Sequence, residues 1–179
     1  GLPIIDIKVM KSIFPTNDFK VLVAMGYQNL NKLRTLKYNQ VKEMGYNCIS
    51  YVSSKAYNIG NVSVGENCII LENNTINTTS KIGNNNVLWC GNHIGHHSTI
   101  DNNCFIAGHV IIAGSTRINS NTFIGVNSSI GHQITIGSEN IIGANSLITK
   151  NTKPKSVFIN KDSDLYKLNS EYFTKLTRL

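Results

Sequence analysis

Aliphatic residues recur at every sixth position through the middle of the chain. A helix repeats its faces every 3.6 residues and a simple strand every two, so a period of six fits neither alone. It predicts a short strand followed by a corner, with one branched aliphatic side chain pointing inward in each repeat. Fifteen consecutive steps land on valine, isoleucine or leucine, at Val64, Ile70, Ile76, Ile82, Leu88, Ile94, Ile100, Ile106, Ile112, Ile118, Ile124, Ile130, Ile136, Ile142 and Ile148.

The residues between these aliphatic positions have the composition of tight corners. The residue after each aliphatic is usually small, and asparagine is frequent in runs such as ENNTINTT and GNNN. Glycine and asparagine tolerate the left-handed backbone that such corners need. The pattern resembles the hexapeptide-repeat, left-handed parallel β-helix, in which three hexapeptides form one triangular coil. It therefore predicts a mainly β prism of about five coils, stacked at the strand spacing of roughly 4.8 Å.

The segment before the repeats has a different pattern. Residues 19–25 (FKVLVAM) predict a buried strand, and residues 47–52 (NCISYV) a second one. Residues 29–44 between them predict a helix that ends at Gly45, with an apolar face formed by Leu30, Leu33, Leu36, Val41 and Met44. Strand, helix and strand together predict a partial βαβ unit.

These patterns divide the chain into three parts. We expect the βαβ unit in residues 1–58, the prism in residues 59–152 and a C-terminal tail in residues 153–179. Residues 163–179 predict a short helix with Leu165, Leu168, Tyr172 and Leu176 on one side. We expect this helix to pack across an end of the prism and cover its open β edge.

The charge of the chain narrows the range of partners. The formal net charge of +7 suits a phosphate-bearing ligand, and it fits an ordinary basic surface equally well. No block of lysine and arginine of the kind that follows a nucleic-acid backbone is present, so we expect no nucleic acid as a partner. No apolar run is long enough to span a membrane, and no signal peptide is seen.

The four cysteines form no CxxC pair, which favours reduced thiols in a cytoplasmic protein. Cys104 falls on an inward small-residue position and should be inert, while Cys90 is only a weak candidate for a nucleophile. The sequence opens at Gly1 without a methionine, and we expect a further strand and helix upstream.

Three of the five histidines fall within five residues, in the stretch WCGNHIGHHSTIDNNC from residue 89 to residue 104. In the repeat that starts at Ile94, His96 and His97 take the third and fourth positions, which are corner positions facing outward. His132 lies on the same edge two coils away, with Gly114 between them, so we expect open space for a ligand beside His96. The imidazole of a histidine titrates near neutral pH and suits a general base.

The alternative is that these corner histidines are solvated turn residues. We interpret His93 and His109 as structural.

A zinc site is the second alternative. His96 and His132 are 36 residues apart, which matches the first gap of prism enzymes that resemble carbonic anhydrases. The third ligand of that pattern would fall on position 137, which is glycine. Two histidines make a poor zinc site, so we expect no metal. A zinc hydratase or a non-catalytic prism is the least favoured reading.

The βαβ unit, the prism and the corner histidine together resemble the sugar acyltransferases related to sialic acid O-acetyltransferase. That group includes the nucleotide-amino-sugar N-acetyltransferases, such as the bacillosamine-pathway enzyme. The segment IGHHST resembles the hexapeptide that carries their base, which implies a catalytic role for His96, and His97 stands where Glu or Asp usually follows. The segment VAMGYQNLNKLR resembles their nucleotide-sugar-binding turn, which implies Met25, Gly26 and Asn29 as substrate-binding residues.

The same resemblance implies an acetyl-CoA groove along the small corner residues. Its members would be Ala113, Gly114, Val126, Asn127, Gly143 and Ala144. A main-chain N–H near Gly114 is the candidate donor to the oxyanion. The resemblance also implies a homotrimer, with the CoA groove between adjacent subunits.

The function that this resemblance implies is acetyl transfer from acetyl-CoA to the amine of a nucleotide-linked sugar in surface glycan biosynthesis. Transfer to a sugar hydroxyl of a surface polysaccharide is the alternative. The sequence departs from the family in lacking its opening glycine–histidine–glycine turn and its usual Gly-x-Pro-Ala ending. Which sugar and which nucleotide are used stays open.

Overall fold

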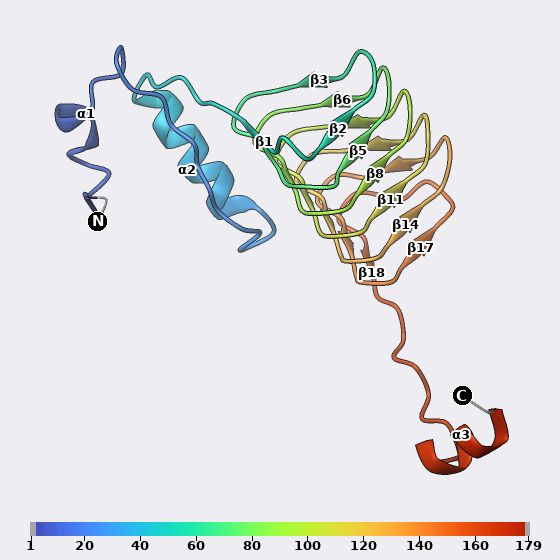
Figure 1. The fold of residues 1–179 in the computed structure, drawn as a ribbon. Helices are drawn as coiled ribbons and strands as arrows, with labels where there is room; N and C mark the ends of the chain where they lie inside the picture. Colours follow the sequence, from blue (N-terminus) through green and yellow to red (C-terminus); the bar gives the residue numbers. More distant parts are fainter. Residues whose placement is uncertain (1–2, 178–179) are drawn as a thin grey trace.

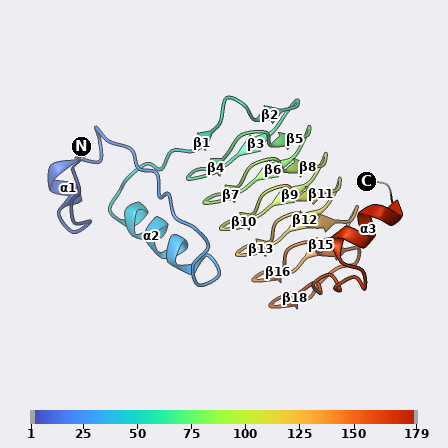
Figure 2. The ribbon, with the colours of Figure 1, turned by 60° about the horizontal axis from the view of Figure 1, so that its bottom comes forward.

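The computed structural model describes residues 3–177 and consists mainly of short strands stacked as a triangular prism (Figures 1 and 2). The first face holds β1 (Tyr51–Val52), β4 (Ile69–Ile70), β7 (Val87–Leu88), β10 (Phe105–Ile106), β13 (Phe123–Ile124), β16 (Ile141–Ile142) and β18 (Val157–Phe158). The second holds β2 (Tyr57–Asn58), β5 (Thr75–Ile76), β8 (His93–Ile94), β11 (Ile111–Ile112), β14 (Ser129–Ile130) and β17 (Leu147–Ile148). The third holds β3 (Ser63–Val64), β6 (Lys81–Ile82), β9 (Thr99–Ile100), β12 (Arg117–Ile118) and β15 (Thr135–Ile136).

All strand pairs are parallel, and each strand pairs with the one a full turn away, as Ile94 does with Ile112 and Ile112 with Ile130. The predicted left-handed parallel β-helix is confirmed as the fold. Sheets of seven, six and five strands make about six turns rather than about five. The difference arises because β1 and β2 start the stack at Tyr51, ahead of the expected residue 59, and β18 extends it beyond residue 152.

The inward aliphatic residues form one continuous core. From Ile70 to Ile142 they are all buried, and Cys68, Cys104 and Val110 fill gaps between them. Each isoleucine removed from water in this way stabilises the fold by roughly 1.5–3 kcal/mol. Because the core is a column of identical layers, the corners project at fixed places on the outside.

Three corners separate the faces, and each carries a column of residues 18 positions apart. The first corner, between the first and second faces, comprises residues 53–56, 71–74, 89–92, 107–110, 125–128 and 143–146. The second corner, between the second and third faces, comprises residues 59–62, 77–80, 95–98, 113–116 and 131–134. The third corner, between the third and first faces, comprises residues 65–68, 83–86, 101–104, 119–122 and 137–140.

Asparagine residues on the third corner have the left-handed backbone that the sequence predicts. Asn67, Asn85 and Asn103 have φ values of 54°, 56° and 63°. Their side chains form a ladder, since Asn67 Nδ2 donates to Asn85 Oδ1 and Asn85 Nδ2 donates to Asn103 Oδ1, each at 2.8 Å. The N-terminal segment packs against this corner, where the Val23 N–H donates to Asn67 Oδ1 at 2.7 Å.

The predicted βαβ unit is only partly formed. Helix α1 (Met10–Ile13) precedes it, and its strands are reduced to a single parallel bridge between Val21 and Cys48. The end of the second predicted strand, residues 51–52, belongs to the prism as β1. Since no further strand lies beside the Val21–Cys48 bridge within the described residues, the pairing does not extend.

Helix α2 (Lys32–Glu43) lies beside the prism, and it is shorter than the predicted 29–44 (Figure 1). The predicted apolar face is partly wrong, because Leu33 and Leu36 are 37% and 61% exposed. The residues that α2 buries are Arg34 and Val41. The reason is that Arg34 is hydrogen-bonded to the prism, which rotates the helix away from the leucine face.

The C-terminal helix α3 (Ser170–Thr177) buries none of its residues. Figure 1 shows it apart from the prism, at the end of an extended tail. The prediction that this helix covers the end of the prism is therefore wrong, because Leu165, Tyr172 and Leu176 all remain exposed. Residues 178–179 of the predicted helix lie outside the described residues. Within residues 3–177, no helix has the length and apolar character needed to cross a membrane.

Candidate active site

His96 lies at the second corner, directly after β8. Its imidazole ring rests on Gly114, one turn along the prism. A Cβ atom at Gly114 would lie only 2.7 Å from His96 Nε2, so this position must be glycine for the ring to take its place. The space that the sequence predicts over Gly114 is thus filled by the ring itself, and the exposed outer side of the ring is the side that a ligand could approach.

His97 contacts the other side of this ring. The Nδ1 atoms of His96 and His97 are 2.9 Å apart, so the pair shares one hydrogen bond in which one Nδ1 donates and the other accepts. When His96 Nδ1 carries the proton, His96 Nε2 has a free lone pair and can act as a base. The left-handed backbone of His97, with φ of 57°, turns its side chain back toward His96.

The main chain around these rings is held by the ladder of the prism. The His97 N–H donates to Thr78 O at 3.1 Å, and the Ser115 N–H donates to His96 O at 2.8 Å. The corner is therefore a rigid support for both side chains. This agrees with the exposed corner positions that the six-residue repeat predicts for them.

His132 joins the same edge. Its ring centroid lies 6.4 Å from that of His96, so three imidazoles gather around Gly114. His93 points outward from the second face, where its Nε2 lies 3.3 Å from Asn77 Nδ2. Among residues 3–177, no three histidine, cysteine, aspartate or glutamate side chains are placed together to hold a metal ion.

The predicted acetyl-CoA residues lie on two different corners. Ala113 and Gly114 are on the second corner, beside His96. Val126, Asn127, Gly143 and Ala144 are on the first corner, where Asn127 Nδ2 donates to Asn145 Oδ1 at 2.8 Å. Because the two corners are separate edges of the prism, one chain does not bring the two sets together.

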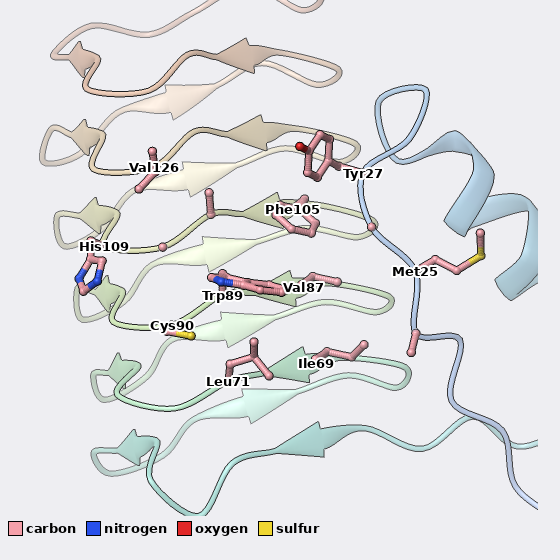
Figure 3. A pocket seen from close by; sticks show the side chains of 14 residues that line it. Met25, Tyr27, Ile69, Leu71, Val87, Trp89, Cys90, Phe105, His109 and Val126 are labelled. Carbon is pink, nitrogen blue, oxygen red and sulfur yellow. The ribbon is translucent and has the colours of Figure 1, made fainter. Parts of the chain in front are cut away.

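A groove of about 860 Å³ lies between the N-terminal segment and the first face (Figure 3). Met25 and Gly26, two of the predicted substrate-binding residues, are in its wall, whereas Asn29 is not. The Met25 side chain packs into the cluster of Val23 and Val41. Met25 thus meets the groove mainly through its backbone, and Figure 3 shows its side chain turned toward α2.

The sequence analysis missed most of the groove. Its apolar floor includes Val87, Trp89 and Phe105, with His109 toward the first corner. Tyr27 stacks edge-on against Phe105, with ring centroids 4.9 Å apart. The signal that could have revealed it is the residue before each inward aliphatic, because on the first face that outward residue is repeatedly apolar or aromatic.

Neither Cys90, the weak candidate for a nucleophile, nor Cys104, which is expected to be inert, has an activated thiol. Burial raises the pKa of Cys104 to about 12, which agrees with the expected inert thiol. Burial and a hydrogen bond to Glu72 raise the pKa of Cys90. Since the thiolate is the nucleophilic form, these raised pKa values do not favour an acyl-enzyme on Cys90 or Cys104. All four cysteines are free thiols, as expected.

Residues 79–114 and 115–150 match the bacterial transferase hexapeptide family, a model of six repeats. These residues include His96, Gly114 and His132. No curated protein sequence matches the chain.

Several solved structures have a similar fold. A variant of perosamine N-acetyltransferase from Caulobacter crescentus, in complex with CoA and GDP-perosamine, has a TM-score of 0.81 at 20% identity over 87% of this chain and 72% of that one. The acetyltransferase domain of PglB from Neisseria gonorrhoeae has a TM-score of 0.80 at 17% identity over 86% and 73%. AntD, an N-acyltransferase from Bacillus cereus in complex with dTDP and 3-hydroxybutyryl-CoA, has a TM-score of 0.59 at 14% identity over 79% and 93%. At these identities the likeness is one of fold, and it extends beyond the repeats to the N-terminal segment.

Proposed function

We propose that the chain is an acetyl-CoA-dependent N-acetyltransferase that acts on a nucleotide-linked amino sugar in surface glycan biosynthesis. The observation that carries this proposal is the arrangement of His96, whose ring lies exposed on Gly114 with its Nδ1 held by His97. The similar folds of proteins that bind CoA with GDP-perosamine, or an acyl-CoA with dTDP, support the substrate class.

In the proposed reaction the amino nitrogen of the sugar attacks the carbonyl carbon of the acetyl thioester. His96 Nε2 accepts the proton that this nitrogen loses. The carbon–sulfur bond then breaks, and the departing CoA sulfur takes the proton from His96. The acetyl group passes directly to the sugar, and no residue of the chain is acylated.

His97 takes the place of the usual carboxylate in orienting the base. A neutral His97 accepts a hydrogen bond from the N–H at His96 Nδ1, which leaves His96 Nε2 unprotonated. A neutral partner supports the imidazolium that forms during the reaction less than a carboxylate would, because it carries no negative charge. The Gly114 N–H remains our candidate donor to the oxyanion, since it makes no hydrogen bond to another described residue.

The two predicted halves of the acetyl-CoA groove fit a homotrimer. If three prisms pack around a common axis, the second corner of one subunit can face the first corner of the next. Ala113 and Gly114 would then lie opposite Val126, Asn127, Gly143 and Ala144 of a neighbouring copy. Light scattering should give three times the protomer mass of 19.8 kDa. Because acetyl-CoA is a cytoplasmic cosubstrate, we place the reaction in the cytoplasm.

The decisive experiment measures thiol release from acetyl-CoA with a panel of UDP-, dTDP- and GDP-linked amino sugars. We expect release with at least one acceptor and a fall of about 10²–10⁴-fold in kcat for His96→Ala. His93→Ala is the matched control, because it removes an exposed imidazole from the adjoining strand β8, three residues before His96. Release only with hydroxyl acceptors would replace the amine by an alcohol as the acceptor. Full activity in His96→Ala would refute the assigned base.

A further inference from the structure

Arg34 is a cation buried between three parts of the molecule. Arg34 belongs to α2, and its side chain is fully buried between the N-terminal segment and the third corner of the prism. Within residues 3–177 no carboxylate pairs with it, since the ion pairs found there join Lys42 to Glu66, Arg117 to Asp101 and Lys175 to Glu171. Burial lowers its pKa to about 10, so it stays charged at neutral pH. An unpaired buried cation persists only where many hydrogen bonds replace its hydration.

The guanidinium donates five hydrogen bonds, all to uncharged oxygens. On the prism side, Nη2 donates to Asn103 O at 3.1 Å and to Cys104 O at 3.0 Å, and Nε donates to Asn85 O at 3.3 Å. On the other side, Nη1 donates to Gly26 O at 2.8 Å and to Asn31 Oδ1 at 3.1 Å. One rigid planar group therefore joins the prism to the wall of the groove.

The loop that Arg34 holds is strained. Asn29, Leu30 and Asn31 have consecutive left-handed φ values of 50°, 49° and 65°. L-residues other than glycine rarely adopt this conformation, least of all three in a row, and it persists only where the surroundings enforce it. Asn31 supplies part of that enforcement, since its Nδ2 donates to Thr122 O at 3.4 Å while its Oδ1 accepts from Arg34.

These contacts hold one wall of the groove, formed by the N-terminal segment around Gly26 and Tyr27, opposite its floor on the first face of the prism. Gly26 O is fixed by Arg34, and the next residue, Tyr27, stacks on Phe105 and Phe123 with centroids 4.9 and 4.8 Å away. Arg34 also lies over the Phe105 ring, with its Cζ 6.0 Å from the centroid. The width of the groove thus depends on a residue that does not line it.

We propose that Arg34 is the positioning residue of this groove. It clamps Gly26 and the strained loop of residues 29–31 to the third corner and so sets the site for the nucleotide-linked sugar. The proposal rests on the proposed function for the identity of the ligand, and not for the clamp itself. A lysine cannot replace Arg34, because a single ammonium group cannot donate at once to the acceptors on the third corner and to those in residues 26–31.

Trp89 provides a test that does not depend on the ligand. It is the only tryptophan of the chain, lines the groove and is half exposed. In Arg34→Lys we expect quenching of its fluorescence by acrylamide to rise at least twofold, because the wall moves away. Lys42→Met is the matched control, since it breaks the Lys42–Glu66 contact between α2 and the prism without touching the loop. In Lys42→Met we expect acrylamide to quench Trp89 fluorescence to the same extent as in the wild type.

Kinetics give the second test. Arg34→Lys should raise KM for the nucleotide-linked amino sugar at least tenfold and leave KM for acetyl-CoA within twofold, whereas Lys42→Met should change neither.

Circular dichroism shows whether each variant is folded. If Arg34→Lys does not fold, Asn31→Ala removes one acceptor of the clamp and should give the same changes in smaller measure. If the wild type releases no thiol with any amino sugar, the proposed function fails and Trp89 quenching alone decides. Unchanged quenching in a folded Arg34→Lys, or equal changes in Lys42→Met, would overturn the clamp.

Discussion

In the prism every turn repeats the contacts of the turn beside it, whereas residues 3–50 are held by a few contacts that are all different. The prism buries an aliphatic side chain at nearly every sixth residue, and each strand inside a sheet is hydrogen-bonded to two neighbours. The N-terminal segment has a small cluster around Val23, Val41, Tyr46 and Cys48, together with the Arg34 clamp and the Glu66 contacts. The core of the prism can lose one contact among many, while the N-terminal segment depends on single residues.

This difference means that the core of the prism determines stability, while the N-terminal segment determines the groove. The prism places His96, His97 and His132 on one edge because the repeat places every corner. The groove exists only because an unlike segment is attached to the first face. We therefore expect changes in the prism core to lower stability as a whole, and changes around α2 to alter the groove first.

The largest change in stability should come from the middle of the prism. Ile106→Ala removes a fully buried side chain that has neighbouring layers on both sides, so it should lower the free energy of unfolding by about 2–5 kcal/mol. Val41→Ala, in the small N-terminal cluster, should lower it by at most about 2 kcal/mol. Urea unfolding measures both, and hydrogen exchange should show opening confined to residues 3–50 in Val41→Ala. Equal losses and global opening in both variants would contradict the comparison.

The next effect concerns activity rather than stability. In Gly114→Ala the new methyl group would meet the His96 ring, which must then swing away. We expect kcat/KM to fall about a hundredfold, equivalent to about 2.7 kcal/mol, with little change in the melting temperature. Gly131→Ala on the same corner is the control, because its methyl group would meet backbone near Ile148 at 3.3 Å and not the histidine. Wild-type activity in Gly114→Ala would show that the observed ring position is not needed.

A smaller effect should appear at acid pH. Hydrogen bonds from Tyr38 and Lys42 lower the pKa of Glu66 below its usual value of 4.5. A carboxyl group with a lowered pKa in the folded state stabilises that state above its usual pKa, and the stabilisation is lost as the pH falls through the folded-state value. Between pH 7 and pH 3 the wild type should therefore lose more stability than Glu66→Gln does.

Glu171→Gln is the control for this pH effect, because the Glu171–Lys175 pair is exposed on α3 and should contribute little. Thermal unfolding followed against pH measures all three proteins. If the wild type and Glu66→Gln lose the same stability between pH 7 and pH 3, the hydrogen bonds of Glu66 are not the source of the effect.

The smallest effect should come from the tail. Ending the chain after residue 162 removes α3, which buries none of its side chains. The melting temperature of the prism should change by less than about 1 °C, because few contacts are lost. Differential scanning calorimetry checks this, and a larger fall would mean that α3 packs against a surface in solution, such as another copy of the chain.

The sequence predicted the prism more accurately than it predicted the N-terminal segment. The six-residue period places Ile94, Ile112 and Ile130 in register and puts His96 and His132 on one edge without any structure. The same reading chose the wrong face for α2, because hydrophobic spacing favoured Leu33 and Leu36 over Arg34. A buried arginine held by main-chain carbonyls leaves no periodic signal, since its acceptors in the prism are 51 to 70 residues away in sequence.

The repeat alone therefore specified the prism and the positions of its corner residues, because neighbouring turns are related by a constant step along the chain. Tertiary structure decided the rest. It placed the His96 ring on Gly114 and beside His97, buried Arg34 against the third corner, and built the groove between Gly26 and Phe105. These features depend on how side chains from distant segments meet, and neither local preference nor periodicity encodes that meeting.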